Sequence, residues 1–197
     1  MPLALVSDIH GNDRALAAVV AELERLGIEQ AVCLGDAVQG GDEPREVLDR
    51  LAALGWPVVL GNADDFLLEV PADSPEPITE QHLARREWTL SRLEPKHLDQ
   101  IRSFPPTLAV DGLLAFHGSP RSYDDVLLPD TEDDSAWHVD GFAVIAGGHT
   151  HLQWTRIVGG ALYVNPGSVG VSDDGLAQFA VLTGRSVAFK RVAWNAS

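Results

Sequence analysis

The stretch Leu3-Ala4-Leu5-Val6-Ser7-Asp8-Ile9-His10-Gly11-Asn12 joins an apolar run to a cluster of polar side chains. Its first four residues are typical of a buried β-strand, and a helical pattern follows directly. Asp8 and His10 are therefore expected at the carboxyl end of the first strand, which is where ligands bind in an open α/β sheet. A carboxylate and an imidazole at this spacing can both reach one metal ion. The pair becomes informative only if other parts of the chain supply further ligands at the same place.

The pattern of strand, polar turn and helix recurs twice in the residues that follow. We expect helices from residue 12 or 13 to 26 and over 43–54, and strands over 31–34 and 57–60. The first of these strands ends in Gly35-Asp36, and the second ends in Gly61-Asn62-Ala63-Asp64. Alternating strands and helices predict a parallel sheet with right-handed crossovers.

The rest of the chain divides into a helical insertion and a set of short strands. The insertion covers about residues 65–106, with helices expected over 79–93 and 95–103. Asp111-Gly112 between two apolar runs is a strong hairpin signal. Strands are expected over 107–110, 113–116, 142–146, 153–158, 161–164, 177–182 and 186–192. A parallel first half and an antiparallel second half suggest one domain, residues 1–197, in which two sheets pack face to face with helices outside.

Charge and composition narrow the set of partners. The net charge of −15 argues against binding to long nucleic acid or to an anionic membrane, because both need a basic face. An anionic substrate is still possible if bound metal ions reverse the local charge. We expect a cytoplasmic protein, because the start of the chain lacks the charged region of a signal peptide and no apolar run approaches the roughly 20 residues that span a membrane. The single Cys33 lies in an apolar run and is expected to be a buried thiol.

Short oxygen and imidazole ligands follow five of the predicted strands. They are Asp8, His10, Asp36, Asn62, His117, His149 and His151. Each lies in a glycine-rich turn, and packing alone does not explain why four of the seven histidines fall in such turns. Nitrogen and oxygen ligands without thiolates favour Mn, Fe, Zn, Ni or Co over Ca or Mg. Seven ligands are too many for one tetrahedral site, and they suit two divalent metal ions, about 3.5–4 Å apart, that share a bridging carboxylate.

The ordered blocks resemble the signature of calcineurin-like metallophosphoesterases. The blocks are Asp8-x-His10, Gly35-Asp36, Gly61-Asn62-x-Asp64, His117 and Gly148-His149-Thr150-His151. The size of the chain and the stretch Asn165-Pro166-Gly167-Ser168 are similar to the small bacterial and archaeal phosphodiesterase branch. The resemblance implies an α/β/β/α sandwich, in which two packed mixed β-sheets are flanked by helices.

The resemblance also implies an assignment of roles. One metal ion would be bound by Asp8, His10, Asp36 and His151, and the other by Asp36, Asn62, His117 and His149, with Asp36 as the bridge. A hydroxide that bridges the two ions would attack phosphorus in line, while the ions neutralise the charge growing on the phosphoryl group. Asp36, Asn62 and His117 are the expected catalytic residues, with Asp64 orienting water or a neighbouring ligand. Asn62 is also expected to contact the substrate.

One position departs from the family pattern. Many members have a histidine after the asparagine, where it helps to protonate the leaving group, whereas this chain has Ala63. Alanine can neither donate a proton nor bind a metal ion. We therefore hypothesise that turnover depends on good leaving groups or on a proton from water.

Two further residues are candidates for contact with a substrate phosphate. Asn12 either contacts the phosphate or caps the helix that follows it. Arg121 either binds a phosphate, because a guanidinium matches its geometry, or forms a surface ion pair with Asp124 or Asp125. The acidic segment 123–140 is expected to be a solvated loop, with a flap over the site as the alternative. The histidines without ligand neighbours, expected to be surface or packing residues, are His82, His97 and His138.

These observations favour an enzyme, most of all a phosphodiesterase that hydrolyses small phosphate esters. Phosphomonoesterase or protein phosphatase-like activity at the same centre is an alternative, and so is a non-catalytic protein-binding scaffold on this fold. Scaffolds of this superfamily tend to lose ligands, whereas every ligand position is filled here. A homodimer is possible because small family members often pair.

Overall fold

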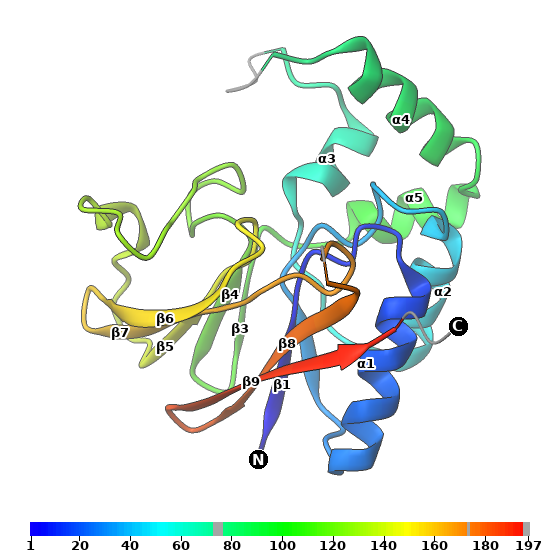
Figure 1. Cartoon of the computed structure of the whole chain (residues 1–197). Coiled ribbons are helices and arrows are strands. Elements are labelled where there is room, and N and C mark those ends of the chain that lie inside the picture. The colour runs from blue at the N-terminus through cyan, green and yellow to red at the C-terminus, as the bar shows by residue number, and fades with distance from the viewer. Residues whose placement is uncertain (73–76, 173, 195–197) are drawn as a thin grey trace.

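A computed structural model of the chain describes residues 1–72, 77–172 and 174–194, and Figure 1 labels its elements. Residues 73–76, which belong to the predicted insertion, lie outside the described part. The helices are α1 (Asp13–Leu26), α2 (Pro44–Leu54), α3 (Asn62–Leu68), α4 (Glu80–Leu90), α5 (Pro95–Arg102) and the 3₁₀ turn η1 (Ser135–Trp137). The strands are β1 (Leu3–Val6), β2 (Ala31–Cys33), β3 (Thr107–Val110), β4 (Leu113–Phe116), β5 (Val144–Ala146), β6 (Gln153–Val158), β7 (Ala161–Pro166), β8 (Leu176–Thr183) and β9 (Ser186–Ala193).

The strands form two mixed sheets. The four-stranded sheet has the order β2-β1-β8-β9, and the five-stranded sheet has the order β3-β4-β5-β7-β6. Strand β1 is parallel to β2 and antiparallel to β8, while β5 is parallel to both β4 and β7. The predicted architecture of two packed mixed sheets flanked by helices is confirmed. The expected division into a parallel first half and an antiparallel second half is wrong, because the last hairpin, β8–β9, joins the first strand.

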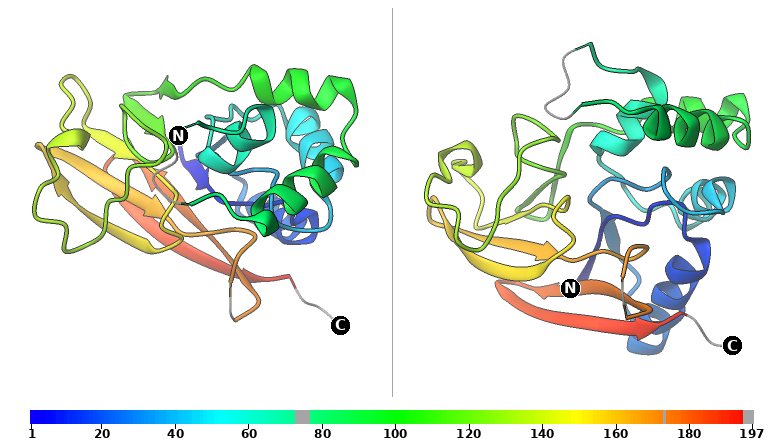
Figure 2. Two further views of the ribbon diagram at one scale, coloured as in Figure 1. Left: turned by 90° about the horizontal axis from the view of Figure 1, so that it is seen from above. Right: turned by 45° about the horizontal axis from the view of Figure 1, so that its top comes forward.

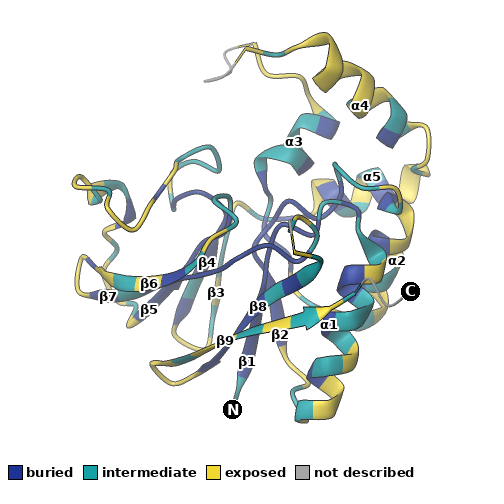
Figure 3. Ribbon diagram, in the orientation of Figure 1, coloured by how far each residue is buried: buried dark blue, intermediate teal, exposed yellow. Residues whose placement is uncertain are grey.

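Strand β1 shows how the layers are built. Successive side chains of a strand point to opposite faces. Leu3 and Leu5 belong to the apolar layer between the two sheets, while Ala4 and Val6 belong to the layer beneath the helices. The helix layer also contains buried residues of α1, α2 and α5, namely Leu16, Val19, Val47, Leu48 and Ile101. Figure 3 shows β1 in dark blue, and all four of its residues are buried, so this strand lies in the centre of the protein.

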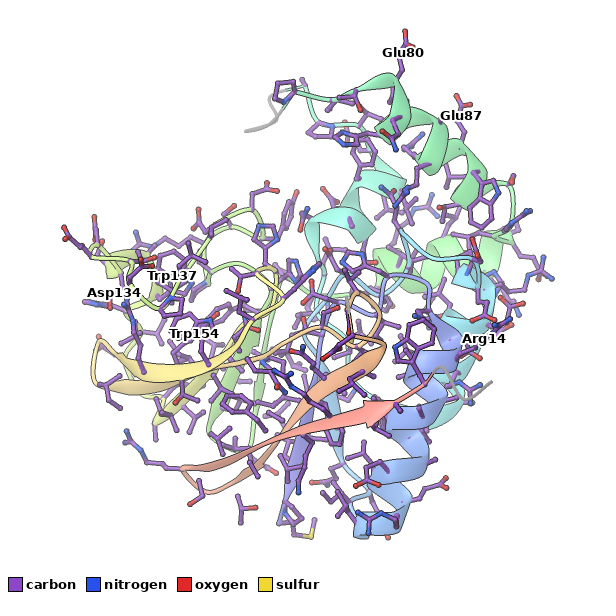
Figure 4. All side chains as sticks on the ribbon, in the orientation of Figure 1. Arg14, Glu80, Glu87, Asp134, Trp137 and Trp154 are labelled. Carbon is purple, nitrogen blue, oxygen red and sulfur yellow. The ribbon has the colours of Figure 1, made fainter. Side chains whose placement is uncertain are left out.

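The outer face of the five-stranded sheet is covered by residues 117–143 rather than by a long helix. Trp137 of η1 packs with Leu127, Trp154 and Tyr163, and Figure 4 shows the two labelled indoles on this side of the molecule. The Trp137 indole Nε1 donates a hydrogen bond of 2.7 Å to the carbonyl oxygen of Gly118. The acidic segment, for which the sequence predicts a solvated loop, therefore buries apolar side chains. The hydrogen bond from Trp137 to Gly118 also holds the chain just after β4 in place.

Next to the site, two elements differ from those predicted from the sequence. The strand expected over 57–60 is reduced to one parallel bridge between Cys33 and Val58, and Pro57 has no N–H with which to extend the pairing toward the start of β2. The chain then enters α3 at Asn62, where a turn was expected. Two carboxylates, Asp64 and Asp65, favour a helix start there.

The two predicted helices of the insertion and the hairpin after it are confirmed, and the two helices have shifted ends. Helix α4 ends at Leu90 and α5 at Arg102, earlier than predicted, while the hairpin β3–β4 turns at Asp111-Gly112 as expected. None of the helices in the described ranges is long and apolar enough to cross a membrane. Figure 2 shows α3–α5 on one side, and the loop after β4 on the other side, of the edge at which β1 ends.

Candidate metal centre

All seven predicted ligands meet at one edge of the two sheets. They come from the turns after β1, β2, β4 and β5 and from the first residue of α3. The two groups whose ligand atoms lie within 4.8 Å of one another are Asp8, His10 and His151, and Asp36, His117 and His149. Asn62 joins the second group, because its Oδ1 is 3.1 Å from Nε2 of His117.

The Asp36 carboxylate lies between the two groups. Its Oδ2 is 3.4 Å from Nε2 of His117 and 3.8 Å from Nε2 of His10. Its Oδ1 accepts a hydrogen bond of 2.8 Å from the backbone N–H of Ala63, which orients the carboxylate. One oxygen of Asp36 thus faces ligand atoms of both groups, and this is the position that a bridging ligand needs.

The first group contains a buried oxygen that lacks a hydrogen bond. Asp8 is fully buried, and its Oδ1 accepts no hydrogen bond from any described residue, although Nε2 of His151 is only 3.1 Å away. Nε2 of His10 is 3.2 Å from the same histidine nitrogen. Leaving a buried acceptor without a partner costs on the order of 1–3 kcal/mol, and more for a charged group. A cation bound by these three side chains would remove that cost.

Backbone carbonyls fix the tautomers of two histidines. Nδ1 of His10 is 2.7 Å from the carbonyl oxygen of Gln39, and Nδ1 of His117 is 2.7 Å from that of Leu34. A carbonyl oxygen can only accept, so each Nδ1 carries the hydrogen. In a neutral ring the Nε2 lone pair then points into the site, as metal ligation requires.

The charges of the site favour a cation. Burial lowers the pKa of the His117 imidazole, but the Asp36 carboxylate outweighs burial and raises this pKa to about 10. Burial raises the pKa of Asp36, yet the neighbouring His117 holds it well below its usual range. The negative charge that favours a proton on the ring nitrogen also attracts a metal ion to this place. The nitrogen and oxygen donors, the unpaired oxygen of Asp8 and the shared oxygen of Asp36 therefore fit two divalent ions.

The ligand-bearing turns have an unusual backbone. Among the described residues, the non-glycine positions with positive φ are Asp8 (55°), His10 (49°), Asp36 (52°), Asp111 (48°), His149 (68°) and His151 (58°). Asp111 lies in the hairpin turn, and the other five are predicted ligands. A left-handed conformation costs roughly 1–2 kcal/mol for such residues and persists only where the surroundings enforce it. Backbone strain is therefore concentrated at the predicted ligands.

Asp64 is fully buried behind the turn that carries Asp36. Its two carboxylate oxygens accept hydrogen bonds of 3.1 Å from the N–H groups of Ala37 and Val38. Burial, together with the negative charge of Asp36, raises the pKa of Asp64 to about 7. These bonds suit a side chain that fixes the turn after Asp36. The expected roles in orienting water or a ligand stay predictions.

The two candidate phosphate-binding residues have different surroundings. The side chain of Asn12 caps α1, because its Oδ1 accepts from the N–H of Ala15 at 3.0 Å, and its Nδ2 donates to the carbonyl of Gly170 at 3.1 Å. Arg121 is exposed and forms no ion pair with Asp124 or Asp125 in the described structure, where Asp125 accepts a hydrogen bond from Ser119. Contact of Asn12 or Arg121 with substrate stays a prediction.

The acidic segment after β4 reaches the other side of the site. The Tyr123 hydroxyl donates a hydrogen bond of 2.5 Å to Asp65 of α3. Partial burial raises the pKa of Asp124, while the nearby His149 acts in the opposite direction. The sequence pattern predicted a loop or a flap here and singled out neither of these two residues as a neighbour of the site.

A cavity of about 480 Å³ opens beside the first group of ligands. His10, His151 and Ala63 line it on one side, and Gln81, His82 and Arg85 of α4 line it on the other. His82 is exposed, as predicted for a surface residue, but it also borders this cavity. No sequence signal indicates this position, because α4 is polar on nearly all sides and its distance from the ligands depends on the tertiary fold.

The chain is similar to a known protein family and to several known proteins. The family model for the calcineurin-like phosphoesterase superfamily domain matches residues 1–186. The chain is 28% identical to the uncharacterized protein MJ0912 of Methanocaldococcus jannaschii, over 88% of this chain and 78% of that protein. It is similar to the crystal structure of a metallophosphoesterase from Sphaerobacter thermophilus, with 25% identity, a TM-score of 0.79, and coverage of 98% of this chain and 88% of that one. The hypothetical protein PH1004 from Pyrococcus horikoshii shares the fold with a TM-score of 0.87 at 22% identity, over 99% of this chain and 89% of that one.

Proposed function

The chain belongs to the calcineurin-like phosphoesterase superfamily, and from this we propose that it is a metal-dependent phosphodiesterase that hydrolyses small phosphate esters. The observation that carries the proposal is the position of Asp36 Oδ2, which faces Nε2 of both His10 and His117. A shared carboxylate oxygen between two ligand groups is what a pair of divalent ions requires.

We assign one ion to Asp8, His10, Asp36 and His151 and the other to Asp36, Asn62, His117 and His149. Mn, Fe, Zn, Ni and Co all suit these donors. When bound, two such ions acidify a water molecule, bind the phosphate oxygens and neutralise the negative charge that develops during in-line attack at phosphorus.

The side chains around the ligands supply orientation. The carbonyls of Gln39 and Leu34 keep the lone pairs of His10 and His117 directed into the site. The bonds of Asp64 to Ala37 and Val38 hold the turn that presents Asp36. Such positioning is the main contribution that a protein makes to phosphoryl transfer, because reacting groups must be held close to their final geometry.

The remaining step is protonation of the leaving group. Ala63 lines the cavity beside His10 and cannot donate a proton. Substrates with acidic leaving groups, which need no proton donor, are therefore favoured. Diesters are favoured over monoesters because a monoester carries more negative charge, and the protein itself has a net charge of −15.

The test compares two esters with the same leaving group. Protein stripped of metal and then reloaded with Mn²⁺ is assayed with bis(p-nitrophenyl) phosphate and with p-nitrophenyl phosphate. We expect metal-dependent turnover with a higher kcat/KM for the diester, and loss of that turnover in Asp36→Ala. A higher kcat/KM for the monoester would favour the phosphomonoesterase alternative.

The scaffold alternative gives a different set of results. Protein that binds no divalent transition metal and is inert toward both esters would support a protein-binding scaffold. Full metal-dependent activity in Asp36→Ala would contradict the assignment of Asp36 as a bridging ligand, whatever the substrate.

A further inference from the structure

Helix α4 forms a wall of the cavity that contains the first group of ligands. Gln81, His82 and Arg85 lie on its cavity side, opposite His10 and His151. Figure 4 shows the side chains of Glu80 and Glu87 of the same helix pointing away from the body of the protein. The helix therefore presents a cation and neutral donors to the cavity, and carboxylates to solvent.

Arg85 is the cationic side chain that lines this cavity. The side chain is exposed, and its Nη1 is 3.5 Å from the carbonyl oxygen of Gly40 on the opposite wall. Within the described ranges, no carboxylate forms an ion pair with it. By contrast, the adjacent Arg86 donates two hydrogen bonds to the carbonyl oxygens of Phe66 and Leu67 and anchors α4 on α3. Arg86 has a structural role, and the Arg85 guanidinium remains available to a ligand.

His82 adds a hydrogen-bond donor beside Arg85. Its Nδ1 accepts from the backbone N–H of Thr79 in the cap of α4. In the neutral ring the hydrogen must then be on Nε2, which makes this nitrogen a donor. Gln81, four residues before Arg85 and on the same helix face, adds an amide. A guanidinium, an imidazole N–H and an amide N–H can together donate hydrogen bonds to the oxygens of one phosphate group.

We propose that Arg85, supported by Gln81 and His82, forms a second anion subsite that binds a phosphate group of the substrate other than the one being cleaved. The proposal rests on the proposed function, because the cleaved phosphate would lie at the ligands His10 and His151 on the opposite wall. It names the substrate class as a small phosphodiester that carries a second phosphate group, such as an ester of the 5′-phosphate of a nucleoside 3′,5′-bisphosphate. The cavity volume of about 480 Å³ lies in the range of small-molecule sites.

The test uses two substrates with the same scissile bond. One is the p-nitrophenyl ester of thymidine 5′-monophosphate, and the other is the same ester with an added 3′-phosphate. The Mn²⁺-loaded wild type should hydrolyse the second ester with the lower KM. Arg85→Gln should raise that KM about tenfold, as expected for loss of one charge-assisted hydrogen bond, and should leave kcat/KM for the first ester within about twofold. Arg85→Lys should restore part of the preference.

Binding and a control variant complete the experiment. Calorimetric titration of the loaded protein with thymidine 3′,5′-bisphosphate should show the same loss of affinity in Arg85→Gln. The control is Arg102→Gln, which removes another exposed arginine, paired with Asp99 of α5 and outside the cavity lining. Its substrate preference and its affinity for the bisphosphate should match those of the wild type.

The possible failures are distinct. A wild type that hydrolyses both esters with equal KM, or an Arg85→Gln variant that keeps the preference, overturns the second subsite but leaves the proposed function intact. A wild type that binds metal and hydrolyses neither ester overturns the proposed function. An equal loss of preference in Arg102→Gln would show that the effect arises from overall charge, and this too would overturn the subsite.

Discussion

Gly61→Ala tests whether close packing on Asp36 sets the metal centre. Gly61 has an extended backbone, with φ −100° and ψ 166°, which alanine adopts without strain. A Cβ at this position would overlap Oδ1 and the backbone nitrogen of Asp36 and would lie 2.9 Å from its Cγ. The substitution therefore acts through this contact alone, and the Asp36 carboxylate must shift away from the position between His10 and His117.

The expected magnitude follows from overpacking. A methyl group forced into a well-packed site destabilises a protein by about 1–3 kcal/mol. For a chain of this size, each kcal/mol lowers Tm by about 2–4 °C, so we expect a decrease of about 2–12 °C. Displacing a group that orients a ligand weakens metal affinity by about 10–100-fold. Thermal unfolding in chelator and Mn²⁺ titration measure the two effects separately.

Gly160→Ala is the matched control. Gly160 has φ 89° in the turn between β6 and β7, and a Cβ added there would meet no described atom within 4 Å. Alanine at this position costs roughly 1–2 kcal/mol of backbone strain without touching the site. We expect a similar decrease in Tm and unchanged Mn²⁺ affinity. If Gly61→Ala retained wild-type Mn²⁺ affinity and turnover, the close approach of Gly61 would not be what positions Asp36.

Three further predictions concern the metal, the missing proton donor and the helix cap. A metal ion at a concentration 1,000 times its Kd stabilises the folded state by about 4 kcal/mol. Removal of the metal by a chelator should therefore lower Tm by roughly 8–16 °C. An unchanged Tm would argue against a resident metal site. The wild type should prefer p-nitrophenolate to alkoxide leaving groups. Ala63→His should raise kcat for alkyl esters at least about tenfold, since general acids contribute about 10²-fold or more. A wild type that prefers alkyl esters would contradict the role given to Ala63. Asn12→Ala should remove about 1 kcal/mol of stability through loss of the α1 cap and leave KM unchanged, whereas a raised KM at unchanged Mn²⁺ affinity would assign Asn12 to phosphate binding.

The clustering of the predicted ligands could be anticipated from the sequence because it depends on local order. Each strand-ending turn carries its own ligand, and parallel strands place their carboxyl ends at one edge of a sheet. The order of strands and turns along the chain is therefore enough to bring Asp8, His10 and Asp36 together. The start of α3 was missed because Gly61-Asn62-Ala63-Asp64 has the composition of a turn, and only the acidic residues after it favour a helix.

Features that depend on distant parts of the chain could not be predicted. Leu3 pairs with Leu182 across almost the whole sequence, and no local pattern indicates that β8 and β9 join β1. The left-handed backbone of His149 and His151 could not be predicted locally, because a residue with a Cβ keeps this conformation only where its surroundings enforce it. The position of Arg85 on the same cavity as His10 likewise requires α4 to lie over the strand ends.

The antiparallel partner of β1 follows it only after a long stretch of chain. Strand β1 ends at Val6, whereas β8 begins at Leu176, so a growing chain holds a fully apolar strand with one unpaired edge until β8 has left the ribosome. Pairings of such long sequence separation form slowly, and exposed apolar edges promote aggregation. Removal of β8 and β9 should therefore yield aggregation-prone chains that need chaperones, whereas a chain that contains both strands closes the four-stranded sheet when β8 pairs with β1.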